Sequence, residues 1–217
     1  MSDAPRGPAA VLAVALLFLA GAGGYAFGAR GDTAPSRSSV DVGFLYDMIG
    51  HHEQALTMAN AEVRHGTNPN IRNFAREIIL FQSYEIGQMQ RQLEHWGYER
   101  DDPPARAMAW MGTAVPPDSM PGMASAQELE LLEDAQGATA DALFVPLMQD
   151  HHRGGIHMAE HAAESGSEAW VRDLAGLMAR NQRSEIIEMG LARDQAGLPK
   201  SPPGYVPAVI PEATHPH

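Results

Sequence analysis

The stretch DMIGHHEQALTMA, residues 47–59, places two adjacent histidines in a run whose apolar residues recur at helical spacing. One hundred residues later the chain reads LMQDHHRGGIHMA, residues 147–159, with a methionine, the histidine pair and a Met-Ala at the same positions. The register continues without insertion through two units, residues 44–97 and 144–197. A duplicated pattern of this kind predicts two copies of one structural unit.

Each unit is expected to form a helical hairpin. Ser38 or Ser39 is a suitable N-cap for the first helix, Pro69 suits the first position of the second, and a glycine follows each helix. Loops of a few residues place the two helices of a hairpin antiparallel. One hairpin cannot bury its apolar face alone, so the two predict an all-α four-helix bundle with approximate internal two-fold symmetry. The expected helices cover about residues 39–65, 69–96, 139–165 and 167–196.

The segments outside the hairpins differ from them in composition. A connector rich in Pro, Gly and Met joins the hairpins, and SAQE at residues 125–128 is a capping box for a short helix within it. The last 20 residues carry six prolines and are expected to be extended or disordered. The predicted organisation is an N-terminal segment (1–30), a linker (31–38), the bundle (39–197) with its connector (98–138), and a tail (198–217).

The N-terminal segment contains an uncharged run, residues 9–28, flanked by Arg6 and Arg30. About 20 apolar residues in a helix span a hydrocarbon core of about 30 Å. The same residues also fit the apolar region of a secretory signal, with small residues near Ala20 for cleavage. Both interpretations place the rest of the chain outside the cytoplasm, either anchored to the cell membrane or secreted. We favour the membrane-spanning helix, because the apolar run continues past the cleavage position.

The composition restricts the classes of partner. A formal net charge of −12 argues against nucleic acid as a partner. The chain has no cysteine, which excludes disulfides and thiolate metal sites. Its twelve methionines and ten histidines are the remaining soft and borderline metal ligands. A metal ion is therefore the expected partner, and a homo-oligomer is left open.

The histidine pairs are predicted to face the bundle core. At 100° per residue, the Met and His residues of the first motif fall on one stripe about 120° wide, and a Glu and a Met of the next helix fall on a matching stripe. Buried polar groups need partners, which a metal ion or the Glu and Gln side chains across the seam would supply. In the second case the methionines are core filler. The candidate metal ligands are Met48, His51, His52, Met58, Glu85, Met89, Met148, His151, His152, Met158, Glu185 and Met189.

Other histidines and methionines fall outside this set. His157 and His161 lie off the stripe and are expected to face water. The connector methionines form two M-x-x-M pairs, which either cover the end of the bundle or capture a soft metal: Met108, Met111, Met120 and Met123.

These motifs resemble a bacterial family catalogued as domain of unknown function 305. The resemblance rests on MIGHHEQALTMA with QSYEIGQM, MQDHHRGGIHMA with QRSEIIEM, and MPGMAS, and it covers about residues 40–197. It implies a ferritin-like four-helix bundle that is secreted or membrane-anchored. It further implies copper binding in the periplasm and copper tolerance. The ligands implied by the resemblance are the Met and His residues of the candidate set, and the two glutamates are not among them. The donor chemistry agrees independently, since thioether with imidazole suits Cu(I) and imidazole also holds Cu(II).

The sequence thus predicts a non-enzymatic, extracytoplasmic protein that binds copper, Cu(I) in preference, for sequestration or tolerance. One alternative is a ferritin-like di-metal oxidase or ferroxidase, whose site needs Glu-x-x-His motifs. Glu85 and Glu185 are the only carboxylates central in the seam, and neither has a histidine three residues on. The other alternative is a metal-free envelope scaffold. Nucleophilic catalysis has no support, because the chain has no cysteine and no serine is suitably spaced from the histidines.

Overall fold

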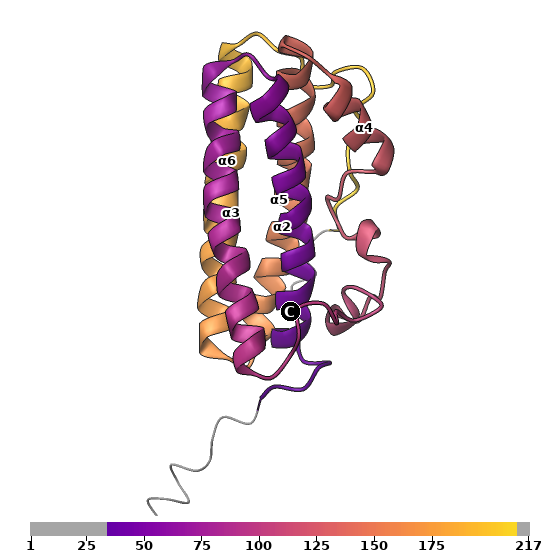
Figure 1. The fold of residues 1–217 in the computed structure, drawn as a ribbon, viewed down its shortest axis with the longest axis vertical. Helices are drawn as coiled ribbons and strands as arrows, with labels where there is room; N and C mark the ends of the chain where they lie inside the picture. The colour runs from indigo at the N-terminus through magenta and orange to yellow at the C-terminus, as the bar shows by residue number, and fades with distance from the viewer. Residues whose placement is uncertain (1–33, 212–217) are drawn as a thin grey trace, which may run out of the picture. The chain divides into compact units, whose positions relative to one another are not determined.

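The structure is a computed structural model that describes residues 34–211. In this range the secondary structure is helical, with one isolated bridge between Ala107 and Val115 and no strand. The all-α prediction is therefore confirmed (Figure 1). The helices are α2 (Val40–His65), α3 (Pro69–His95), α4 (Ala126–Asp134), α5 (Ala138–Ser165) and α6 (Ala169–Gln195), with short 3-10 turns η1 (Ala109–Met111) and η2 (Pro117–Ser119).

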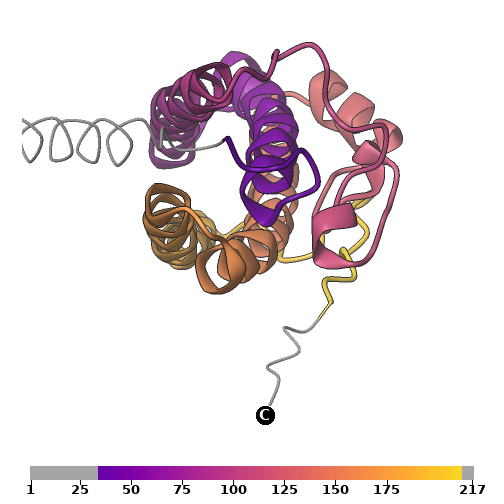
Figure 2. The same ribbon diagram turned by 90° about the horizontal axis from the view of Figure 1, so that it is seen from below.

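The four long helices form a bundle of two hairpins. Helix α2 packs along α3, α5 packs along α6, and the hairpins meet through α2 and α5, whereas α3 and α6 contact each other sparsely. Figure 2 shows that α4 and the connector lie against α2 and α5, on the side away from α3 and α6. The core consequently lies between α2 and α5, where the histidine pairs were predicted to face.

Local sequence signals set the helix ends. The Ser39 side chain accepts a hydrogen bond from Val42 N, and Asn68 accepts from Asn70 N and Ile71 N ahead of Pro69. Ser125 forms the predicted capping box. A glycine that ends a helix commonly has a positive φ, but Gly66, which ends α2, has an ordinary φ of −67°. Its lack of a side chain provides space instead, since a Cβ there would lie 2.0 Å from the Glu62 carboxyl group.

Two buried aspartates tie the hairpins together. Asp141, in the first turn of α5, accepts hydrogen bonds from the backbone N–H groups of Thr67 and Asn68 at 3.0–3.2 Å. Asp41, in the first turn of α2, accepts from Ser167 N at 3.1 Å and from Glu168 N at 2.9 Å. The turn of each hairpin is therefore capped by the other hairpin. Neither bond was predicted from the sequence.

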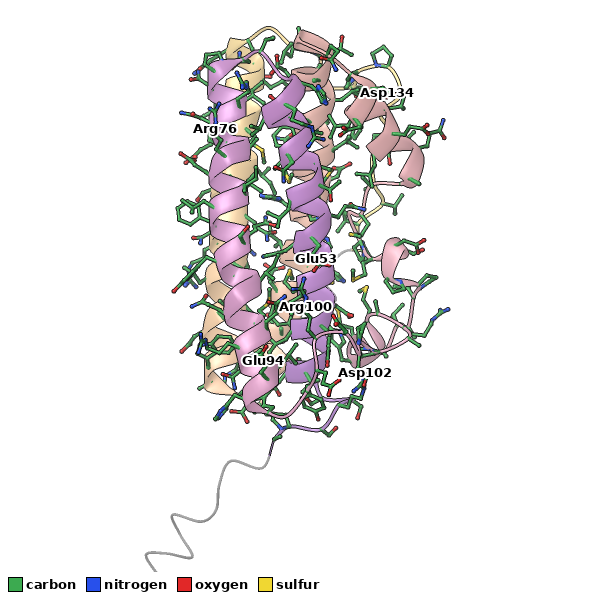
Figure 3. All side chains as sticks on the ribbon, in the orientation of Figure 1. Glu53, Arg76, Glu94, Arg100, Asp102 and Asp134 are labelled. Carbon is green, nitrogen blue, oxygen red and sulfur yellow. The ribbon has the colours of Figure 1, made fainter. Side chains whose placement is uncertain are left out.

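The connector is attached to α2 by side chains that point outward from the bundle. Asp47 accepts from Met108 N at 2.6 Å and from Trp110 Nε1 at 2.7 Å. Gln54 exchanges two hydrogen bonds with the backbone of Ala124. At the start of the connector, Arg100 forms an ion pair with Glu53 at 2.7 Å, and Figure 3 shows the two residues close together.

The C-terminal tail is extended and docked over the described range, residues 198–211. Tyr205 Oη and Ala208 N both donate to Asp150 Oδ2, at 2.6 and 2.7 Å. Within residues 34–211, none of the helices combines the length and apolar character needed to cross a bilayer. The predicted membrane-spanning or signal segment, residues 1–30, lies outside the described residues.

Candidate metal centre

Four histidines form a buried layer where α2 and α5 cross. His51 and His52 come from α2, His151 and His152 come from α5, and none is more than 1% exposed. The rings of His51 and His151 lie face to face, with centroids 3.8 Å apart and planes 34° apart. The predicted histidine pairs from the two hairpins are thus brought together at a single level of the bundle.

Two of these histidines donate to carboxylates on the outer helices. His52 Nε2 lies 2.9 Å from Glu85 Oε2 on α3, and His152 Nε2 lies 2.6 Å from Glu185 Oε2 on α6. Because a carboxylate accepts, the hydrogen in each pair is on Nε2. The glutamates expected in the seam therefore contact the histidines. The side-chain oxygens of Gln82 and Gln182 have no hydrogen-bond partner, so the glutamines do not satisfy the histidines.

The connector supplies the partner of a third histidine. His51 Nε2 donates to the backbone carbonyl of Pro121 at 3.1 Å. Burial, with His52 nearby, lowers the pKa of His51 to about 3. Burial, with His51 nearby, also lowers the pKa of His151 well below its ordinary value. Both imidazoles are consequently neutral at physiological pH, which is the state in which imidazole binds metals.

The remaining ring nitrogens have lone pairs without protein partners. The Nδ1 atoms of His51, His52 and His152 are buried and have no hydrogen-bond partner in the protein. In a neutral imidazole whose hydrogen is on Nε2, Nδ1 is an acceptor with a free lone pair. His151 Nε2 also lacks a partner. Most buried polar atoms in proteins are hydrogen-bonded. Histidines that bind metals typically donate their other N–H to a carboxylate or a carbonyl, and this is the environment of His51, His52 and His152.

The methionines are buried on both sides of the histidine layer. Met48 lies four residues before His52 and Met89 four residues after Glu85, so in antiparallel helices this Met pair sits one turn from the His52–Glu85 pair. The pair Met148 and Met189 has the same relation to His152 and Glu185. All of the predicted core methionines are fully buried: Met48, Met58, Met89, Met148, Met158 and Met189.

The core clusters differ from the sequence interpretation in one respect. The matching stripes were predicted within one hairpin, but Met158 shares a cluster with Met48 and Met89, and Met58 shares the other with Met148 and Met189. The reason is the antiparallel crossing of α2 and α5. Residues that follow the histidines on one helix lie beside residues that precede them on the other. Each methionine group therefore combines both hairpins.

Sequence reasoning missed some residues of the site and misplaced others. Met178 is buried in the cluster of Met48, but position 78 is isoleucine, so the spacing of one hundred did not select it. The Pro121 carbonyl gives no side-chain signal at all. His161 was expected to face water, but it is partly buried with its ring 5.5 Å from that of Trp110. His157 is also partly buried, and burial together with His161 lowers its pKa. The expectation that both histidines face water was therefore wrong, and for His161 the cause is the connector residue Trp110.

A cleft between α3 and α6 leads toward the histidine layer. It has a volume of about 270 Å³, and its walls include Gln82, Glu85, Gln182 and Glu185. Among residues 34–211, no group of three or more His, Asp or Glu side chains is arranged to hold a metal ion. A centre built here would therefore need thioether sulfur in its ligand set.

A helical bundle with a buried His layer and flanking methionines defines the class of this protein. The sequence pattern of the family described as "Domain of unknown function (DUF305)" matches residues 41–192. The chain belongs to this family, which confirms the resemblance seen in its motifs.

Solved structures with the same fold include three informative relatives. A DUF305 protein of Streptomyces coelicolor, named as a candidate secreted protein, is 31% identical with a TM-score of 0.71, covering 76% of this chain and 99% of its own. A DUF305 fragment from Deinococcus radiodurans is 28% identical, with a TM-score of 0.61 and coverage of 71% and 96%. CopM in its Cu(I)-bound form is 25% identical, with a TM-score of 0.54 and coverage of 72% and 96%. Among curated proteins, none matches the chain.

Proposed function

We propose that this protein binds copper outside the cytoplasm, Cu(I) in preference, and serves copper sequestration or tolerance. The observation that carries the proposal is the set of buried Nδ1 lone pairs on His51, His52 and His152, which lack protein partners. Their Nε2–H groups are already engaged, so the rings are oriented for a metal. The similarity to CopM, solved in a Cu(I)-bound form, supports the choice of copper.

The donor atoms near the histidines favour the lower oxidation state. Thioether sulfur and neutral imidazole carry no charge, and they suit a soft monovalent ion better than a hard divalent one. The ligands we propose are the four histidines and the six buried methionines. Glu85 and Glu185 were predicted as ligands, and we now assign them the role of holding His52 and His152, because their carboxylates accept from Nε2. Bound copper would supply redox or storage capacity, whereas the protein supplies buried donor atoms and the carboxylates of Glu85 and Glu185 that orient two of the histidines.

The location follows from the N-terminal sequence and from one relative. We propose that residues 9–28 either anchor the bundle to the cell membrane or direct its secretion. A candidate secreted protein among the structural relatives supports this placement. The di-metal oxidase alternative has less support. The central carboxylates, Glu85 and Glu185, each bond a histidine, and the described residues hold no cluster of His and carboxylate ligands.

The test is a titration of Cu(I) against a competing chelator. His52→Gln or His152→Gln removes an imidazole at similar volume, and we expect affinity to fall by about tenfold or more, about 1.4 kcal/mol per decade. The apo-protein should keep its helical circular dichroism. His95→Gln is the matched control, because His95 is exposed on α3 and far in sequence from the layer. Parent-like affinity in both His52 and His152 variants would contradict the proposal.

Thermal unfolding provides a second readout. A ligand that binds only the folded state stabilises it by about 2.7 kcal/mol at a hundredfold excess over Kd. We therefore expect Cu(I) to raise the melting temperature. The scaffold alternative predicts no change with metal and unfolding of the histidine variants.

A further inference from the structure

A second group of methionines comes from the connector, where Met108 and Met120 join the core cluster of Met48, and Met123 packs against it. An open pocket of about 340 Å³ lies between the connector and the tail, and Met108, Met120 and Met123 contribute three thioethers to its lining. Met108 and Met120 are each 4% exposed, and Met123 is partly exposed. Among residues 34–211 no histidine lines this pocket, which adjoins the imidazole layer through Pro121, whose carbonyl accepts from His51.

The turn that carries two of these methionines has a defined geometry. Met123 N donates to Met120 O at 3.1 Å, with Pro121 and Gly122 between them and a φ of 78° at Gly122. Proline followed by a glycine of positive φ is the pattern of a type II turn, which brings its first and fourth Cα atoms within about 7 Å. The two thioethers therefore leave the backbone close together.

This turn is fixed against the bundle. A Cβ on Gly122 would lie 2.4 Å from the backbone oxygen of Asp150, and a Cβ on Gly154 would lie 1.8 Å from Pro121 O. The Pro121 carbonyl also accepts from His51. Such close approach leaves the turn little freedom to move away from α5, so the positions of Met120 and Met123 are set before any ligand binds.

The third methionine is held by a buried carboxylate. Met108 has φ 59° and ψ 12°, and it is the one non-glycine residue with positive φ among residues 34–211. Asp47 stabilises this conformation by accepting from Met108 N and Trp110 Nε1. A left-handed conformation is unfavourable for a non-glycine residue and often marks a functional position.

We propose that Met108, Met120 and Met123 form a second site for a soft monovalent cation, Cu(I) or Ag(I). Three neutral thioethers match the preference of such ions. The partly exposed Met123 gives the cation access from solvent. The site shares only its class of metal with the proposed function, and it does not require the buried histidines to bind.

The experiment counts bound Ag(I) in the full chain by native mass spectrometry and isothermal titration. Ag(I) is the probe because it has one stable oxidation state in water. Met120→Leu with Met123→Leu should lose one equivalent relative to the parent, whereas His52→Gln with His152→Gln should retain that equivalent. Met111→Leu is the matched control, since Met111, like Met123, is a partly buried connector methionine packed on the core, but it does not line the pocket.

The outcomes separate the two sites. Parent-like stoichiometry and affinity in the connector variant would overturn the second site and leave the proposed function intact. Loss of all Ag(I) binding in the histidine variant would also overturn it as a separate site. Loss of the connector equivalent alone, with histidine variants identical to the parent, would support this site and contradict the proposed function. Because Met→Leu swaps conserve volume, we expect the double variant to fold. If the double variant is nevertheless unfolded, Met123→Leu alone is measured, and it should weaken the same equivalent.

Discussion

The two hairpins, α2–α3 and α5–α6, agree where they face each other and differ where they face the connector. The histidines, the glutamates that bond them, the adjacent methionines and the capping aspartates recur one hundred residues apart. Many other positions differ between the hairpins, and five of these pairs bear on attachment and packing: Asp47 and Leu147, Gly50 and Asp150, Gln54 and Gly154, Glu62 and Ala162, and Ile78 and Met178.

Most of these five pairs contain a residue that attaches a part of the chain that is not repeated. Asp47 and Gln54 bond the connector, Asp150 bonds the tail, and Gly154 gives the connector space to approach α5. Leu147 and Gly50, the counterparts of Asp47 and Asp150, form no such bonds, whereas Gln54 and its counterpart Gly154 both contact the connector in different ways. The difference indicates that attachment of the connector and tail can vary between the hairpins, whereas the histidine layer requires the same residues twice.

The largest effect is expected from Gly154→Ala. Its Cβ would meet the Pro121 carbonyl oxygen at 1.8 Å, and because that atom belongs to the backbone, the whole connector turn must shift. We expect the free energy of unfolding to fall by about 3 kcal/mol, measured by chemical denaturation. Gly50→Ala on α2 is the matched control, because nothing lies within 4 Å of its Cβ. That change should be neutral or stabilise by up to about 1 kcal/mol. Similar losses of unfolding free energy in both variants would contradict the inference that the connector packs closely on Gly154 and not on Gly50.

A smaller and pH-dependent effect is expected at Glu62, whose counterpart is Ala162. Burial, with Asp141 beside it, raises the pKa of Glu62 from 4.5 to about 9. The folded state therefore keeps the proton between these pH values while the unfolded state releases it. Stability contributed by this group is present below about pH 4.5 and is lost as pH rises toward 9.

Glu62→Gln should remove this dependence. The amide can still donate to Asp141 but has no proton to lose, so the variant should exceed the parent by on the order of 2 kcal/mol at pH 8. The gap should narrow as pH falls to 5. Thermal unfolding across this range tests it, with Glu94→Gln as control, since Glu94 is exposed on α3 (Figure 3). A gap that is constant with pH would show that Glu62 is ionised in the fold.

The smallest effect is expected from Met178→Ile, which gives α6 the residue of the equivalent position on α3. A volume-conserving swap in the core should cost less than about 1.5 kcal/mol. The number of bound Ag(I) ions should stay the same, because Met178 is outside the repeated set. Loss of one equivalent would identify Met178 as a ligand and would mean that the hairpins bind metal differently.

The sequence predicted those features that depend on neighbours along the chain. Ser39, Pro69 and the Ser125 capping box set helix ends through local hydrogen bonds, and helical periodicity placed the histidines in the core. The regrouping of Met58 could not be predicted, because it depends on how α2 crosses α5. The Pro121 carbonyl is likewise a backbone group, brought to His51 from 70 residues away.

The reciprocal aspartate caps have a consequence for the order in which the chain folds during synthesis. The bond from Thr67 to Asp141 spans 74 residues, and the bond from Ser167 to Asp41 spans 126. The first hairpin therefore emerges with its turn donors uncapped and with His51 lacking both its ring partner and the connector. Long-range contacts of this kind form late, because loop closure must precede them. The α2–α3 hairpin therefore stays unpaired until α5 packs against it. During that interval its histidines and methionines are accessible to metal ions in the compartment where the chain folds.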